Sequence, residues 1–233
     1  MDERDELEQL RAANETMREF VATAAHELRG PTAAILGFAQ TMLSRWDSIE
    51  DADKQEYLGI IIRRSRYLTR LLDSLLTLSK IEANALDVKP KEIVIREAIG
   101  HAIEDLGEQV RGVEVEAAPD LAIVADPDHV RRILVNYLSN AFKYGEPPVR
   151  VRVDVDGDRV TVAVADDGEG IAEDLVDRLF DRFARSAQAD GEKGTGLGLS
   201  IVRGLARANG GDAWYEPNEP QGSRFAVWFP RSA

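Results

Sequence analysis

The chain has 233 residues and a mass of 25.8 kDa, enough for a helical module plus one α/β domain of roughly 150 residues. Hydrophobic residues make up 44% and charged residues 30%, which excludes a disordered or fibrous chain. The net charge of −13 argues against nucleic acid and anionic lipid as partners, and the lack of cysteine excludes disulfides and thiol catalysis. No apolar run approaches the roughly 18 residues of a membrane span, and the first twenty residues are too charged for a signal peptide. We therefore expect a soluble, cytoplasmic chain, which would reach a membrane only through a segment absent from this sequence.

A seven-residue pattern runs through the first long segment. Alternating steps of three and four pick out a seam that is apolar except at one position: Leu7, Leu10, Asn14, Met17, Val21, Ala24, Leu28, Pro31, Ile35, Phe38 and Met42. A second apolar helical stretch, from Tyr57 to Leu78, follows a polar interruption. Because one such hairpin leaves its seam half open to water, we expect a homodimer that forms a four-helix bundle. The alternative is that the second domain covers the seam within one chain.

The remaining segments predict a mixed α/β layer fold. We expect helices at 96–110, 127–144 and 199–208, and strands at 93–95, 113–115, 121–124, 149–155, 159–165, 213–215 and 224–229. Asp126 and Pro127 predict a capped start for the second of these helices, and Asp156–Gly157 predicts a hairpin turn.

His26 is the most informative single residue. It stands at heptad position f, which points away from the seam, so its neutral imidazole should face solvent and act as a nucleophile. The neighbouring Glu27 can take or orient the ring proton. A merely solvated histidine is the alternative, whereas an H-E-x-x-H zinc motif is rejected because Gly30 occupies the place of its second histidine. Gly30 and Pro31 predict a kink and a soft helix one turn beyond His26.

Two amides and a cation share one face of the helix expected at 127–144. Asn136, Asn140, Lys143 and Tyr144 are spaced by four, three and one residues, which aligns them on a helix. Such a stripe suits a phosphate-bound Mg²⁺ and its anion. An ordinary solvated helix face is the alternative.

An acidic, glycine-containing turn follows the strand expected at 159–165. It reads Asp166-Asp167-Gly168-Glu169-Gly170-Ile171. Alternating glycines let the backbone approach a planar ligand, and a carboxylate oxygen is available to an exocyclic amine. A calcium loop is disfavoured, because Arg159 stands where the nearby aspartates would need a glycine.

A glycine-rich loop precedes the helix expected at 199–208. Its sequence from Gly191 to Leu199 lets successive amides point at phosphate, and the following helix start adds its dipole. It matches neither a Walker A loop nor the dinucleotide fingerprint. A flexible linker is the alternative.

The order of these motifs resembles the H, N, G1, F and G2 boxes of bacterial sensor histidine kinases. The matching segments are His26 to Pro31, the double-asparagine helix, the turn at Asp166, the stretch Phe180 to Arg185, and the Gly-Thr-Gly-Leu-Gly-Leu loop. The resemblance implies that His26 accepts phosphate, that Glu27 is its base, that Asn140 holds Mg²⁺ and that Asp166 reads the adenine amine. The nucleotide site that it implies comprises Asn136, Asn140, Lys143, Tyr144, Asp166, Gly168, Gly170, Ile171, Phe180, Arg182, Phe183, Arg185, Gly194, Thr195, Gly196, Leu197, Gly198 and Leu199.

The resemblance also implies an architecture and a reaction. The fold would be an α-helical hairpin, a dimeric four-helix bundle, followed by an α/β sandwich of the Bergerat ATPase and histidine kinase type. The domains would be a coiled-coil input segment (1–20), a dimerisation and phosphotransfer domain (21–83), a linker (84–90) and a catalytic ATP-binding domain (91–233). The γ-phosphoryl group of ATP would pass to His26 and then to an aspartate in the receiver domain of a response regulator.

Two other functions remain as alternatives. A plain ATPase of the same fold would need a carboxylate to activate water, and Asn136 stands where the similar hydrolases carry that acid. A nucleotide-free dimeric scaffold would not need the glycines or Asp166. One departure from the family also matters: Gly30 stands where members usually carry Thr or Asn, the residue associated with dephosphorylating the regulator.

Overall fold

The computed structural model describes residues 3–107, 110, 112–184 and 194–232, with the backbone alone for 3–14, 16 and 19. The chain divides into two compact units, Met1–Leu76 and Thr77–Ala233. No helix among the described residues combines the length and the apolar character of a membrane span.

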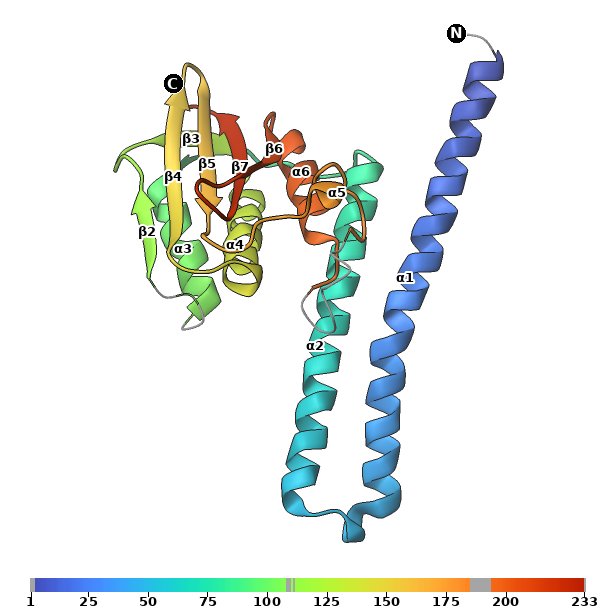
Figure 1. Ribbon diagram of the computed structural model, residues 1–233. Helices are drawn as coiled ribbons and strands as arrows, with labels where there is room; N and C mark the ends of the chain where they lie inside the picture. Colours follow the sequence, from blue (N-terminus) through green and yellow to red (C-terminus); the bar gives the residue numbers. More distant parts are fainter. Residues whose placement is uncertain (1–2, 108–109, 111, 185–193, 233) are drawn as a thin grey trace. The chain divides into compact units, whose positions relative to one another are not determined.

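The first unit is a helical hairpin, as the heptad pattern predicts (Figure 1). Helix α1 (Glu3–Arg45) leads through a short 3-10 turn, η1 (Trp46–Ser48), into α2 (Asp51–Glu82), whose last residues belong to the second unit. The rings of Phe38 and Tyr57 lie 5.1 Å apart between centroids and join the two helices. Helix α1 is unbroken across Gly30 and Pro31, and the softness expected there stays a prediction.

The seam of α1 is buried only over part of its length. Ala24, Pro31 and Met42 are buried and Leu28, Ile35 and Phe38 are half-buried, whereas Met17 and Val21 are exposed. A further set of large apolar side chains on the hairpin is also exposed: Leu36, Leu43, Leu58, Ile62, Leu72 and Leu76. One hairpin therefore leaves much of its apolar surface uncovered.

The second unit is a two-layer α/β domain. Its strands are β1 (Lys91–Val94), β2 (Val113–Glu116), β3 (Ala122–Ala125), β4 (Val149–Asp156), β5 (Arg159–Ala165), β6 (Asp212–Pro217) and β7 (Ser223–Pro230). Its helices are α3 (Ile95–Leu106), α4 (Pro127–Tyr144), α5 (Glu173–Val176) and α6 (Gly198–Ala208). The larger sheet has the order β2-β4-β5-β7-β6, with only β2 and β4 parallel, and β1 pairs with β3 in a small antiparallel sheet.

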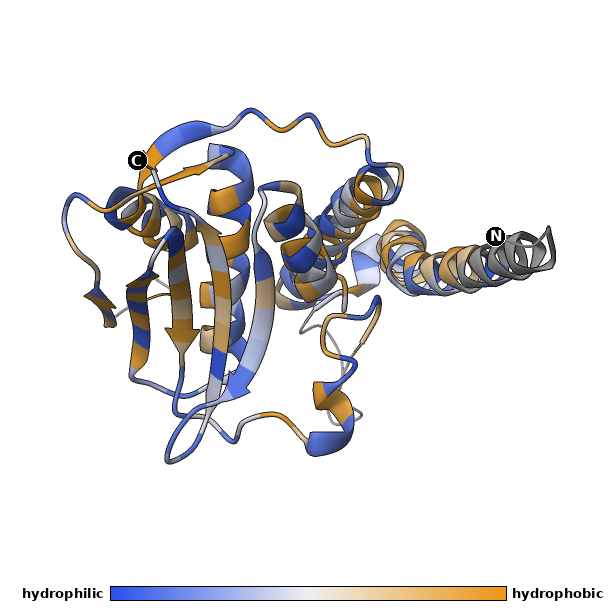
Figure 2. Ribbon diagram, turned by 90° about the horizontal axis from the view of Figure 1, so that it is seen from above, coloured by the Kyte–Doolittle hydropathy of each residue, from blue (hydrophilic) through white to orange (hydrophobic). Residues whose placement is uncertain are grey.

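The core of this domain lies between the larger sheet and the helices α4 and α6. Hydrophilic and hydrophobic residues alternate along the strands of that sheet (Figure 2), as expected of a sheet with one face packed against helices. Helix α4 turns one apolar stripe inward: Val130, Ile133, Leu134, Tyr137, Leu138 and Ala141. The Tyr137 hydroxyl donates to the carbonyl oxygen of Ala226 at 2.9 Å, and complete burial raises the pKa of that hydroxyl.

The predicted elements of the second unit are present with small shifts at their ends. The helix expected over 96–110 ends at Leu106, because Gly107 adopts φ +62°, a conformation that other residues avoid. The short helices η1 and α5 were not predicted, since four or fewer residues carry no readable periodicity.

Candidate functional site

The start of α4 is held by a buried carboxylate. Asp126 caps the helix by accepting from the backbone N–H groups of Asp128 and His129, at 3.0 and 3.3 Å. It also accepts from the N–H of Lys89 at 2.8 Å, and its own N–H donates to Oδ1 of Asn209 at 2.7 Å. Burial alone would raise the pKa of Asp126, but these backbone donors outweigh burial and lower it. The predicted cap is confirmed, and it ties α4 to the end of α6.

The polar face of α4 carries the two asparagines. With the apolar stripe buried, Asn136 and Asn140 are left half-buried at its edge, and Lys143 and Tyr144 are exposed. Nδ2 of Asn140 donates to Oδ1 of Asn136 at 3.2 Å. This bond uses the donor group of Asn140, so its amide oxygen remains suited to a cation.

The glycine-rich loop meets that polar face at both of its described ends. A Cβ atom at Gly198 would lie 2.4 Å from Nδ2 of Asn136, and one at Gly194 would lie 2.8 Å from the hydroxyl oxygen of Tyr144. A larger residue at either position would have to displace the end of that side chain, so the two glycines allow these close contacts. The structure thus brings together the double-asparagine helix and the glycine-rich loop, whose contacting residues are 50 and 62 positions apart in the chain.

The Asp166 loop closes against the end of α4. Asp166 is buried, and its Oδ1 accepts from the N–H of Gly168 at 3.0 Å. A Cβ atom at Gly145 would lie 2.3 Å from Cγ of Asp166, and one at Gly168 would lie 2.8 Å from Cα of Gly145. Gly145 is thus a required close approach that the sequence patterns did not single out. Gly170 has φ +79°, which explains the second glycine of the motif, and Ile171 beside it is half-buried.

The pKa of Asp166 is raised, first of all because burial disfavours its charge. The N–H groups of Gly168 and Ser223 lower it in part, and the nearby charge of Asp167 raises it further. A buried carboxyl with a raised pKa is a candidate for a ligand-binding group.

Helix α6 begins at the end of the glycine-rich loop without a side-chain cap. Thr195 Oγ1 accepts from the N–H of Leu197 at 3.3 Å, and Gly196 has φ +68°. The first amides of a helix and its dipole are suited to bind an anion such as phosphate. The side chain of Leu197 is fully buried in the core, so only its backbone can serve a ligand, and Leu199 is half-buried.

The segment from Phe180 to Arg185 packs against α6, and one of its arginines has a partner that the sequence did not predict. The Arg203 guanidinium lies 4.0 Å from the centroid of the Phe180 ring, which anchors this segment to α6. Arg182 forms an ion pair with Glu82, a use that the phosphate interpretation did not foresee. Phe183 is half-buried and has φ +59°. Arg185 lies outside the described residues.

The histidine motif lies on α1 of the first unit. His26 is exposed, as position f predicts. Glu27 is half-buried, and its Oε2 accepts from the hydroxyl of Tyr67 on α2 at 3.1 Å. No sequence pattern indicated Tyr67, because its contact with Glu27 spans forty residues.

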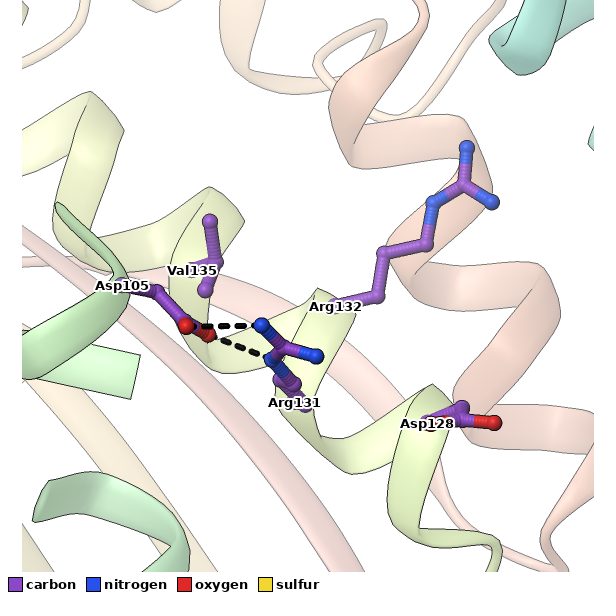
Figure 3. Close-up of a pocket in the computed structure, with 5 residues that line it drawn as sticks. All are labelled: Asp105, Asp128, Arg131, Arg132 and Val135. Carbon is purple, nitrogen blue, oxygen red and sulfur yellow. Dashed lines mark hydrogen bonds and ion pairs between the residues drawn. The ribbon is translucent and has the colours of Figure 1, made fainter. Parts of the chain in front are cut away.

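A hollow of about 400 Å³ opens beside α3 and α4, and none of its lining residues is among the predicted site residues. Its lining residues are Asp105, Asp128, Arg131, Arg132 and Val135. Figure 3 shows Arg131 turned toward Asp105, with which it forms an ion pair, while Arg132 extends away from that pair. The opposite charges largely neutralise each other, so this hollow is a poor candidate for the phosphates.

Comparisons with known proteins define the class of each unit. Residues 16–84 match the His Kinase A (phospho-acceptor) domain, and residues 125–233 match the histidine kinase-, DNA gyrase B- and HSP90-like ATPase domain. The circadian input-output histidine kinase CikA of Synechococcus elongatus is 35% identical over 97% of this chain and 31% of its own length. A sensor-like histidine kinase of Rhizobium meliloti is 33% identical over 95% of this chain and 44% of its own length. The chain thus spans less than half of these relatives.

Solved structures of histidine kinases have the same fold as this chain. Full-length ShkA in complex with AMPPNP superposes with a TM-score of 0.66 at 27% identity, covering 92% of this chain and 46% of that chain. The Acinetobacter baumannii histidine kinase AdeS, at 20% identity, shares the fold with a TM-score of 0.74 over 89% of this chain and 98% of its own. The chain belongs to the sensor histidine kinases, as a transmitter core with a phosphoacceptor hairpin and an ATP-binding domain. The resemblance and the fold class predicted from the sequence are confirmed.

Proposed function

We propose that this chain uses ATP to phosphorylate its own His26 and then passes the phosphoryl group to an aspartate in the receiver domain of a response regulator. The observation that carries the proposal is the convergence of three separate motifs on one site, with Gly194 and Gly198 against the side chains of Tyr144 and Asn136, and Gly145 against that of Asp166. An exposed histidine on the phosphoacceptor hairpin supplies the acceptor.

The nucleotide would be held along the face of α4. The carboxylate of Asp166 would accept a hydrogen bond from the adenine amine, and Lys143 and Tyr144 would line the pocket. The start of α6 and the glycines of its preceding loop would bind the phosphates. Arg182 would join them only after leaving its ion pair with Glu82.

Mg²⁺ would be held by Asn140. Among the described residues there is no group of three or more His, Cys, Asp or Glu that could hold a metal. A single amide oxygen still suits Mg²⁺, because this ion takes most of its ligands from phosphates and water. Bound there, Mg²⁺ would neutralise charge on the phosphates.

The chemical step is an in-line transfer at phosphorus. A ring nitrogen of His26 attacks the γ-phosphorus, the bond from that phosphorus to the β,γ-bridging oxygen breaks, and ADP leaves with the electron pair. Glu27 takes the proton from the other ring nitrogen. The hydrogen bond from Tyr67 supports this role by fixing the orientation of the Glu27 side chain.

The chain would act as a homodimer, with domain limits at 20, 83 and 90. The exposed apolar side chains of the hairpin, from Val21 to Leu76, support this assembly, because burial of each side chain contributes about 1.5–3 kcal/mol. The last residue of α2 is Glu82 and the first of β1 is Lys91, which supports a linker between them.

Labelling with γ-³²P-ATP tests the proposal. We expect the wild-type chain to acquire a label that is labile in acid and stable in base, as for a phosphoramidate. His26→Gln should bind ATP normally and lose all label, because only the acceptor is removed. His101→Gln, which changes an exposed histidine on α3, is the matched control and should be labelled as the wild type is. Label that persists in His26→Gln would place the acceptor elsewhere.

A further inference from the structure

The turn between β6 and β7 lies directly against the loop that carries Asp166. The turn is closed by a hydrogen bond from the N–H of Asn218 to the carbonyl oxygen of Gly222 at 3.0 Å. Gly222 has φ +114°, and a Cβ atom there would lie 1.9 Å from the carbonyl oxygen of Asp166. The two backbones therefore touch, and no side chain fits between them.

Asn218 is the side chain through which this turn holds the loop. Its Nδ2 donates to the carbonyl oxygen of Asp166 at 2.9 Å and to Oδ1 of Asp167 at 3.2 Å. An amide NH₂ group has two donor hydrogens, and both have an acceptor here. The side chain is half-buried, which shields these bonds from competing water.

The backbone of Asp166 is held on both sides by the same hairpin. Its N–H donates to the carbonyl oxygen of Ser223 at 3.0 Å, and its carbonyl oxygen accepts from Asn218. One carboxylate oxygen, Oδ1, is occupied by the N–H of Gly168. The N–H of Ser223 also acts on this carboxyl group, since it contributes to lowering the pKa of Asp166. The hairpin thus helps to fix the direction in which the carboxyl group points.

The neighbouring Asp167 connects this arrangement to the sheet. Arg150 of β4 donates to both of its carboxylate oxygens, at 2.9 and 3.3 Å. The N–H of Asp167 donates to the carbonyl oxygen of Glu146 at 3.0 Å. Asn218 therefore joins the Asp166 peptide to a carboxylate that is itself fixed by a two-point ion pair.

We propose that Asn218 is a positioning residue for adenine recognition: it holds the Asp166 peptide so that the carboxylate of Asp166 faces the exocyclic amine of ATP. This inference rests on the proposed role of Asp166 as the residue that accepts a hydrogen bond from the adenine amine. Asn218 acts through Asp166 and Asp167 and makes no contact with the nucleotide itself. Loss of its amide donors would let the Asp166 peptide rotate, and the carboxylate would lose its alignment with the amine.

The test compares two nucleotides that differ only in that amine. Calorimetry on the full chain with Mg²⁺ gives the dissociation constants of ATP and of purine riboside 5′-triphosphate, which lacks the 6-amino group. We expect the wild type to prefer ATP. Asn218→Ala and the isosteric Asn218→Asp should each reduce that preference by on the order of fivefold, with the affinity for the analogue unchanged. Gln221→Ala, an exposed position on the same turn, is the matched control and should keep the full preference.

The outcomes separate this inference from the proposed function. If Asp166→Asn abolishes the preference for ATP while both Asn218 variants keep it, the adenine role stands and the positioning role is overturned. If Asp166→Asn keeps the preference, the adenine role fails and this inference fails with it. An equal loss of affinity for both nucleotides in the Asn218 variants, or a failure of both variants to fold by circular dichroism, would mean a purely structural residue. If only the charged Asn218→Asp fails to fold, the uncharged Asn218→Ala decides.

Discussion

The α/β unit completes its own core, whereas the helical hairpin leaves apolar side chains in water. Most residues of β5 and β7, Val149 and Val151 of β4, and the inner stripe of α4 are buried within a single chain. On the hairpin, Leu43 is 86% exposed and Leu36 is 56% exposed, although both are large and apolar. The α/β unit is therefore packed within one chain, whereas the hairpin presents apolar surface of the kind that marks an interaction site. The stability of the hairpin should therefore vary with protein concentration, and that of the α/β unit should not.

The largest effect should come from placing a charge on the exposed apolar face of the hairpin. Leu36→Glu would leave a carboxylate unpaired in each half of a dimer interface, so we expect the dimer dissociation constant to rise on the order of a hundredfold. Analytical ultracentrifugation over a range of concentrations measures this change. The thermal unfolding of the α/β unit should stay the same. Ser48→Glu, at an exposed position of the connecting turn η1, adds the same charge outside both helices and should leave the dimer intact. A dimer of unchanged strength in Leu36→Glu would contradict the proposed interface.

Next in size is the loss of the carboxylate in the α/β unit. Asp166→Asn should weaken ATP binding about tenfold and leave the fold intact, because the change is isosteric at a buried loop position. Asp174→Asn, an exposed position on α5, is the control and should bind ATP as the wild type does. Unchanged affinity in Asp166→Asn would remove Asp166 from the adenine role.

The pH dependence of binding sharpens the same point. Because burial raises the pKa of Asp166, this carboxylate is protonated at a higher pH than an ordinary aspartate. The ionised form is the better acceptor for the amine, so ATP affinity should be full above the raised pKa and fall as the pH drops through it. Calorimetry at decreasing pH should show this loss in the wild type beginning above the ordinary value of 3.8, and Asp166→Asn should lack it. Parallel curves for the two proteins would contradict the assignment.

A smaller effect is expected from the glycine one turn after His26. A Cβ atom at Gly30 would meet nothing within 4 Å, so Gly30→Thr should be accommodated. If the dephosphorylation step needs a hydroxyl there, the variant should remove label from a purified phosphorylated regulator a few times faster than the wild type, in the presence of ADP and Mg²⁺. Gly37→Thr is the matched control, since Gly37 is equally open and lies on the same helix. Rapid dephosphorylation of the regulator by the wild type itself would contradict this prediction.

The smallest change should come from the upstream part of α1. One residue inserted after Ala13 would rotate the preceding seam by about 100° relative to His26. We expect the autophosphorylation rate to change about twofold at matched dimer concentration, because α1 runs as one helix from Glu3 to Arg45 and can transmit rotation. An insertion of seven residues keeps the heptad register and should restore the original rate. Identical rates for the wild type and the one-residue insertion would make the segment a passive tether.

The sequence predicted those features that depend on residues close together in the chain. The Asp126 cap follows from the affinity of a short acidic side chain for the first amides of a helix, and the β4–β5 hairpin follows from alternation on either side of Asp156–Gly157. The order of the motifs was enough to indicate the family. The heptad register of α1 was enough to predict an exposed histidine on its outer face.

The tertiary structure decided which distant residue each polar side chain contacts. Arg182 forms an ion pair with Glu82, and Tyr67 donates a hydrogen bond to Glu27. Asn218 donates a hydrogen bond to the backbone of Asp166. Each of these contacts joins residues that are between forty and about a hundred positions apart in the chain. Leu197 also differs from what its sequence motif indicated. Its place in a glycine-rich loop predicted a contact with a ligand, but its side chain is fully buried in the core. The physical reason is that periodicity, capping and turn preference act over a few residues. Hydrogen bonds and close backbone approaches depend on which distant segments the closed core brings together.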